Sequence, residues 1–149
     1  MKGHKKATLI RLVALILVIA LVAPCAVSAT ATENITPYAS KYLSLYSAYV
    51  HITTSGQVQV WFEVMGTDDM DEIGALSIML YESSDGVNWE WVKTFRHSTT
   101  AGMLENDDYY ISSHVSCQGS VNKQYKAYVC VWAGKNGTGD TRYFWAYEP

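Results

Sequence analysis

The strongest structural signal in the sequence lies in residues 76–95. Two runs of alternating apolar and polar residues flank the dipeptide Asp85-Gly86. Alternation puts every second side chain on one face of a strand, and Asp-Gly is a favoured centre for a two-residue hairpin turn. Such a turn places Leu80 opposite Trp91 and predicts an antiparallel sheet with one buried face. The residues expected on that face are Leu76, Ile78, Leu80, Trp91 and Phe95.

A second hairpin is predicted from the alternating runs 46–53 and 57–64. A three-residue connection sets Ile52 opposite Val58 and keeps the apolar residues on one face, whereas a two-residue connection would mix the faces. Gly56 then occupies the third loop position, where a left-handed backbone is common and glycine fits best. We therefore expect a positive φ at Gly56.

Three further alternating segments complete an all-β pattern. They cover residues 109–118, 125–132 and 141–147, and the longer loops cover residues 65–74 and 98–108. The mature chain shows no helical period. About seven short strands separated by turns are typical of two packed antiparallel sheets. The sequence therefore predicts a single all-β sandwich domain over residues 46–149.

The N-terminal segment has the three regions of a secretory signal peptide. Basic residues precede an apolar run at residues 12–23, and small residues follow it. Cleavage after Ala29 satisfies the small-residue rule and leaves residues 30–45 as a loose N-terminal arm. Two alternatives stay open: an uncleaved membrane anchor, for which the run is short, and a lipid on Cys25, where the preceding Pro24 fits poorly. We expect the mature protein to be secreted and extracellular, with no membrane segment.

Charge and aromatic content narrow the class of partner. Residues 30–149 contain 7 Lys and Arg and all 14 Asp and Glu, so their net charge is −7. Nucleic acids and anionic lipids require a basic face, and we expect neither as a partner. All 11 Tyr, 5 Trp and 3 Phe also lie in residues 30–149. Such enrichment favours strands and provides large side chains for burial or stacking.

Cys117 and Cys130 are the cysteines that remain after signal cleavage. An oxidising compartment favours a disulfide between them. Alternation argues against it, because Cys117 is in phase with core-facing Val115 whereas Cys130 is out of phase with core-facing Val129. A β-bulge between Val115 and Gly119 would bring the thiols to one face, so the sequence leaves this disulfide open.

The sequence carries no signature of catalysis or of a bound metal. His51, His97 and His114 are scattered over separate regions, and neither His-Glu-x-x-His nor Gly-x-Ser-x-Gly occurs. Loop 65–74 is rich in carboxylates, which calcium prefers, but their spacing lacks the ligand pattern and central glycine of the helix-loop-helix site. These carboxylates belong to Asp68, Asp69, Asp71 and Glu72. We expect a solvated loop, no cofactor and no enzymatic activity, with an active site assembled from distant residues as the alternative.

Four short motifs together carry a family resemblance. They are Met70-Asp71 with Gly74-Ala75, Ser84-Asp85-Gly86 with Trp89, Tyr125 and Ala127 leading to Ala133-Gly134, and Gly139-Asp140. In these motifs the chain resembles a family of small secreted all-β proteins of unknown function from Gram-positive bacteria. The resemblance implies an immunoglobulin- or fibronectin-III-like sandwich and brings no known activity or site residues. It also makes Tyr125 similar to the tyrosine corner of such sandwiches, although the early cysteine of true immunoglobulins is absent.

Aromatic residues gather on the outer face of the predicted hairpin sheet, if the two last strands join it. They are Tyr81, Tyr128, Trp132, Tyr143 and Trp145. Exposed rings in a row stack on sugar rings, so this face is a candidate for binding glycans or cell wall; otherwise the arm, loops or a second copy cover it. On the other hairpin, Tyr49 is expected opposite Trp61. The sequence favours a non-catalytic binding or surface-interaction module whose partner is a protein or a glycan.

Overall fold

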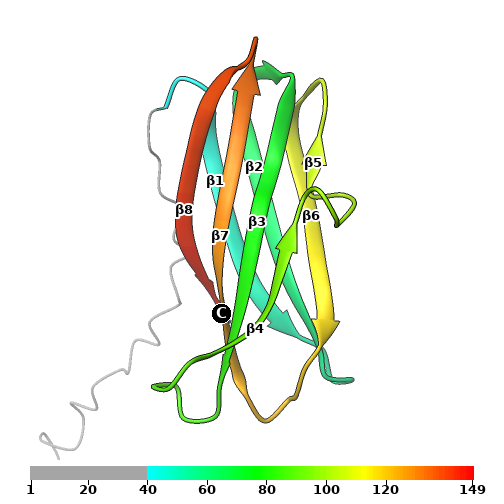
Figure 1. Cartoon of the computed structure of the whole chain (residues 1–149), viewed down its shortest axis with the longest axis vertical. Coiled ribbons are helices and arrows are strands. Elements are labelled where there is room, and N and C mark those ends of the chain that lie inside the picture. The colour runs from blue at the N-terminus through cyan, green and yellow to red at the C-terminus, as the bar shows by residue number, and fades with distance from the viewer. Residues whose placement is uncertain (1–39) are drawn as a thin grey trace, which may run out of the picture. The chain divides into compact units, whose positions relative to one another are not determined.

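Eight β-strands and no helix make up residues 40–149, which are the residues that the computed structural model describes (Figure 1). The strands are β1 (Leu43–Ile52), β2 (Gln57–Met70), β3 (Glu72–Ser83), β4 (Glu90–Arg96), β5 (Leu104–Glu105), β6 (Asp108–Gln118), β7 (Gln124–Lys135) and β8 (Thr138–Tyr147). The predicted signal peptide at 1–29, and most of the predicted arm, lie outside the described residues. Within residues 40–149 no helix is long and apolar enough to span a membrane.

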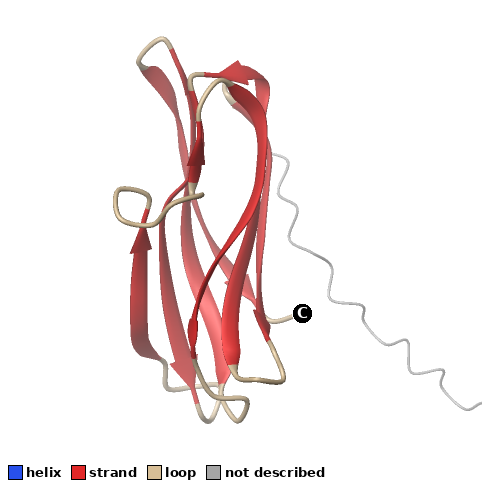
Figure 2. Ribbon diagram, turned by 90° about the vertical axis from the view of Figure 1, so that its right-hand side faces the viewer, coloured by secondary structure: helices blue, strands red, loops and turns tan. Residues whose placement is uncertain are grey.

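The strands form two antiparallel sheets that pack face to face (Figure 2). One sheet has three strands in the order β1-β2-β6, and the other has five, in the order β4-β3-β7-β8 with β5 beside β3. The predicted all-β, two-sheet antiparallel sandwich is confirmed. The short β5 brings the number of strands to eight, where about seven were expected.

The core lies between the sheets and follows the alternation of the strands. From β2 it receives Val58, Val60, Phe62 and Val64, each at most 1% exposed. The facing sheet contributes Ile78, Leu80, Ala127, Val129 and Val131, each with 0% exposure. Because full burial of a side chain of this size stabilises the fold by about 1.5–3 kcal/mol, this layer is the main source of stability.

The β1–β2 hairpin has the predicted register. Ile52 pairs with Val58, and Tyr49 pairs with Trp61. Gly56 has a φ of 80°, as expected for the left-handed third loop position. Its N–H donates to the carbonyl oxygen of Thr53 at 2.9 Å and closes the turn.

The β3–β4 hairpin has a different register from the predicted one. Ile78 pairs with Phe95, and Tyr81 pairs with Trp91. Tyr81 belongs to the outer face, so Trp91 also points outward and is 62% exposed. The prediction that Trp91 lies in the core is therefore wrong, whereas Ile78, Leu80 and Phe95 are buried as expected. Leu76 is only partly buried, because the β3–β7 register shifts next to it.

The reason for the new register is the loop at 84–89, which is wider than a two-residue turn. Asp85 Oδ1 accepts hydrogen bonds from the backbone N–H groups of Asn88 at 2.8 Å and of Val87 at 2.9 Å. Its Oδ2 accepts another from the Asn88 side-chain amide at 2.7 Å. These hydrogen bonds hold the pKa of Asp85 well below its ordinary value, and the bond from the Asn88 N–H has the largest effect. Satisfying the two backbone donors stabilises the wider loop.

Several strands are longer than predicted. β2 continues to Met70 and β3 starts at Glu72, so most of the predicted loop 65–74 is strand. β1 starts at Leu43, which is fully buried, so three residues of the predicted arm 30–45 belong to the sandwich. β8 begins at Thr138 rather than at residue 141, because two residues of positive φ make a tight turn.

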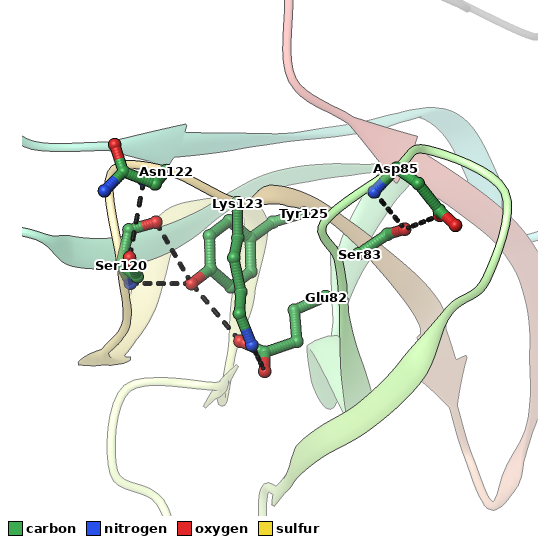
Figure 3. A network of polar contacts seen from close by, with 7 residues as sticks. All are labelled: Glu82, Ser83, Asp85, Ser120, Asn122, Lys123 and Tyr125. Carbon is green, nitrogen blue, oxygen red and sulfur yellow. Dashed lines mark hydrogen bonds and ion pairs between the residues drawn. The ribbon is translucent and has the colours of Figure 1, made fainter.

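Tyr125 opens β7 and ties it to the connection from β6 (Figure 3). Tyr125 is 2% exposed, and its hydroxyl accepts a hydrogen bond from the backbone N–H of Ser120 at 2.7 Å. The same hydroxyl donates to Oε2 of Glu82 at 3.4 Å, and Glu82 also forms an ion pair with Lys123. Burial raises the pKa of the Tyr125 hydroxyl, which favours this protonated form. This contact to the backbone of the preceding connection has the geometry of a tyrosine corner.

Cys117 and Cys130 are free thiols in different sheets. Cys117 pairs with the core residue Val58 and faces the interior of the sandwich. Cys130 pairs with Ser77 and Tyr143 on the outer side of the five-stranded sheet. No register shift interrupts the β2–β6 pairing near Cys117, so the bulge that a disulfide required is absent there. The disulfide that the sequence left open is therefore not formed.

Candidate functional site: an aromatic sheet face

Three neighbouring cross-strand rows form the middle of the outer side of the five-stranded sheet. Across β3, β7 and β8 these rows are Tyr81, Lys126 and Tyr147; Met79, Tyr128 and Trp145; and Ser77, Cys130 and Tyr143. Directly paired residues share a face, and their neighbours along each strand point to the core. Five of these nine side chains are aromatic, so the exposed side of the sheet is as rich in rings as the sequence suggested.

Four of these rings form one connected cluster, which we call the aromatic face: Tyr81, Tyr128, Tyr143 and Trp145. Ring centroids lie 4.9 Å apart for Tyr128 and Trp145, 5.6 Å for Tyr81 and Trp145, and 5.9 Å for Tyr128 and Tyr143. These distances are typical of interacting rings. Within the described residues Tyr143 is 61% exposed and Trp145 is 38% exposed. The aromatic face is therefore open to solvent along β8.

Trp132, the fifth predicted ring, lies apart from this cluster. A Cβ added at Gly134 would lie 2.4 Å from its Cζ2 atom, and one at Gly139 would lie 2.5 Å from its Cη2 atom. The indole thus lies directly on this pair of glycines, which are cross-strand partners. Its Nε1 atom is buried and has no hydrogen-bond partner among residues 40–149. Trp132 therefore packs on the end of the β7–β8 hairpin and does not join the open platform.

Lys126 and Trp89 extend the aromatic face on the side of the 84–89 loop. The amine of Lys126 lies 4.2 Å from the centroid of the Trp89 ring and 4.6 Å from that of Trp145. Trp89 directly follows Asn88, whose bonds to Asp85 fix the loop. This arrangement had no direct signal in the sequence, because the predicted short turn placed Trp89 within strand pairing.

Cys130 lies in the floor of the aromatic face, in the same row as Tyr143. It is 5% exposed, and burial raises the pKa of its thiol, while the neighbouring Tyr143 and Ser77 side chains act in the opposite direction. The thiol in turn raises the pKa of the Tyr143 hydroxyl. Both groups are therefore protonated and uncharged at neutral pH, which keeps the floor of the face neutral.

A second, smaller ring row crosses the outer side of the three-stranded sheet. Trp61 stacks on His114 with centroids 4.4 Å apart, and on Tyr49 at 6.5 Å with an interplanar angle of 7°. The Trp61 indole N–H donates to the Gln59 side chain at 3.1 Å. A hollow of about 30 Å³ between β1, β2 and β6 lies beside this row, and it is only large enough for water. The sequence predicted the pairing of Tyr49 with Trp61 but not the role of His114.

Two carboxylates of the acidic segment at the β2–β3 junction contact other groups of the protein. Asp68 forms an ion pair with Lys135 at 2.9 Å, and the bond to this lysine is the first cause of its lowered pKa. Asp71 accepts a hydrogen bond from the backbone N–H of Asn136 at 2.6 Å. Among residues 40–149 no group of three His, Cys, Asp or Glu side chains is arranged to hold a metal ion.

Comparison with known proteins found no matching family model, curated protein or solved structure.

Proposed function

We propose that this chain is an exported, non-catalytic binding module and that glycans bind to its aromatic face. The observation that supports this proposal is the connected, solvent-exposed ring cluster on the outer side of the five-stranded sheet. Its most exposed members, Tyr143 and Trp145, are separated by one residue on β8 and so point to the same side, and the Tyr128 ring lies beside both. Such a platform presents flat ring surfaces to a ligand without requiring a deep pocket.

The chemistry of the exposed side chains favours a sugar. A pyranose has C–H groups on its faces and hydroxyl groups on its edges, so it fits rings that carry a polar atom at the rim. Tyr81, Tyr128 and Tyr143 each supply a hydroxyl, and Trp145 supplies an indole N–H. On the strands, every large hydrophobic residue that is exposed is a Tyr or Trp, whereas the exposed aliphatic residues Val87 and Val121 lie in connections.

Export is the other part of the proposal, and it rests on the sequence. The three-region segment at residues 1–29 supports a secretory route, as does the resemblance to small secreted proteins of Gram-positive bacteria. The negative charge of residues 30–149 speaks against nucleic acid and anionic lipid as partners. The proposed ligand is therefore a polysaccharide outside the cell, including cell-wall polymers.

A polysaccharide panel with neutral and acidic polymers tests the proposal. The protein, made from its full-length sequence, is compared with Tyr143→Ala, Trp145→Ala and the matched control Tyr49→Ala on the other sheet. Stacking of a ring contributes about 1–3 kcal/mol by analogy with base stacking, so each aromatic-face variant should bind about tenfold or more weakly. The Tyr49→Ala control should bind like the parent, and thermal melting should show that all variants are folded.

Two results would refute the proposal. The first is a parent protein that binds no polymer of the panel. If Trp145→Ala also changes it from a dimer to a monomer, the rings serve contact between two copies instead. The second is loss of glycan binding in Tyr49→Ala alone, which would move the site to the Trp61 row. Light scattering on the same samples measures the oligomeric state.

A further inference from the structure

Lys126 is a cation held at the edge of the aromatic face without an anionic partner in the described part of the chain. Its amine lies between two indoles, 4.2 Å from the Trp89 centroid and 4.6 Å from the Trp145 centroid. The ion pairs among residues 40–149 are those of Lys123 with Glu82 and of Lys135 with Asp68. Within this part of the chain Lys126 is therefore not neutralised by a carboxylate.

The two rings fix the position of this charge. The electron-rich face of an indole attracts an ammonium group, and two such faces restrict the flexible lysine side chain to one region. The Asp85 hydrogen bonds in turn fix the loop that carries Trp89. A ring face accepts no conventional hydrogen bond, so the ammonium N–H that does not point at the two rings stays available for a ligand. The charge is thus preorganised for binding.

The charge of the face is opposite to that of the protein as a whole. Across β3, β7 and β8 its three rows contain Lys126 as the single charged residue, and β4 adds only Arg96, opposite Ser77, so none of the rows contains a carboxylate. Residues 30–149 carry a net charge of −7. An anionic ligand is therefore repelled by the protein in general and attracted at this position, which makes the contact selective.

We propose that Lys126 selects a carboxylate-bearing sugar, so that the ligand of the aromatic face is an acidic polysaccharide of the uronic-acid class. This inference rests on the glycan-binding function proposed above. A sugar ring stacked on Tyr81 or Tyr128, the two rings that adjoin Trp145, places its edge toward the Lys126 amine, because that amine lies over the Trp145 indole. A carboxylate on this edge gains a charge-assisted hydrogen bond. A neutral sugar at the same place gains the stacking alone.

A pair of polymers with one backbone isolates the carboxylate. Polygalacturonate carries a free carboxylate on each sugar, and its fully methyl-esterified form has the same backbone without the charge. The parent protein, made from its full-length sequence, should bind the acid about tenfold or more tightly than the ester at low ionic strength. The preference should decrease when the salt concentration is raised to roughly 1 M, because salt screens an exposed charge pair.

Two substitutions at one position test the role of the lysine. Lys126→Met keeps an apolar side chain between the two indoles and removes the charge, so its affinity for the acid should fall to that for the ester. Lys126→Arg keeps the charge and should restore the preference for the acid. Thermal melting of both variants controls for folding.

The outcomes separate this inference from the function on which it rests. A parent that binds neither these polymers nor others of the panel refutes glycan binding itself. A parent that binds acid and ester equally, or a Lys126→Met variant that keeps the preference, refutes the role of Lys126 and leaves glycan binding in place. Equal affinity for polygalacturonate and dextran sulfate refutes selection of a carboxylate, because the site would then respond to any anion.

Discussion

Gly56 ends the β1–β2 loop with a φ of 80°, and a Cβ there would lie 3.3 Å from the carbonyl oxygen of Gly119. Gly56→Ala should therefore lower the free energy of unfolding by about 1 kcal/mol or more. Gly137→Ala is the matched control: Gly137 also has a positive φ, of 73°, but nothing lies within 4 Å of the added Cβ. Any additional loss of stability in Gly56→Ala therefore measures the contact of the new Cβ with its neighbours. Chemical denaturation measures both. A Gly56→Ala variant as stable as the parent would contradict the strain.

Asp85 gives the protein a pH dependence of known sign. Its pKa is lowered in the folded state by the N–H groups of Asn88 and Val87, whereas an aspartate in an unfolded chain has a pKa of about 3.9. The carboxylate therefore stabilises the fold above about pH 4, and this contribution is lost as the pH falls further. Asp85→Asn should reduce the melting temperature at neutral pH, and its difference from the parent should shrink between about pH 4 and pH 2. A difference independent of pH would contradict this role.

Trp132 and Asp85 show what the sequence could and could not predict at this scale. The packing of Trp132 depends on the absence of side chains at Gly134 and Gly139, which become neighbours only after strand pairing. The two glycines on either side of the turn could have predicted this packing from the sequence. Asp85 suits either a two-residue turn or a wider loop, and only its bonds to residues 87 and 88 decide between them.

At the scale of elements, β4 offers a direct test of register. Phe95→Ala should cost about 3–5 kcal/mol of unfolding free energy, because Phe95 is 4% exposed in the core. Trp91→Ala should change it by about 0.5 kcal/mol or less, since this residue is 62% exposed. The two-residue turn would instead bury Trp91. A large loss of stability in Trp91→Ala under chemical denaturation would favour that register.

The two hairpins differ in how well alternation specifies them. In β1–β2 only one loop length keeps Ile52 opposite Val58, so hydrophobic pattern and turn geometry agree. In β3–β4 the pattern was compatible with Trp91 inside. The wider loop shifts the pairing so that Trp91 lies opposite Tyr81, and an irregularity between Leu80 and Tyr81 shifts the rest of the hairpin further. Irregularities of this kind depend on packing across the sandwich. The alternation in β7 and β8 correctly predicted which side of the sheet carries the aromatic cluster. The contact of Lys126 with Trp89 could not be predicted, because it depends on the wider loop at 84–89.

At the scale of the molecule, the sandwich is held by its core and hydrogen bonds without a cross-link in residues 40–149. The protein should therefore have the same melting temperature with and without reductant. Unfolding without reductant followed by alkylation should modify both Cys117 and Cys130, as intact mass measures. A mass two hydrogens lower, with thiols that resist alkylation until reduced, would contradict the free-thiol arrangement.

The position of these thiols has a practical consequence. Cys130 lies beneath the aromatic face in the row of Tyr143, while Cys117 faces the interior from the other sheet. A ligand seated on Tyr143 would slow the reaction of Cys130 with a small alkylating reagent and leave that of Cys117 unchanged. The native chain thus contains a chemical reporter of occupancy together with its internal reference. Competition with unlabelled polysaccharides could be followed on it by mass spectrometry, without any introduced probe.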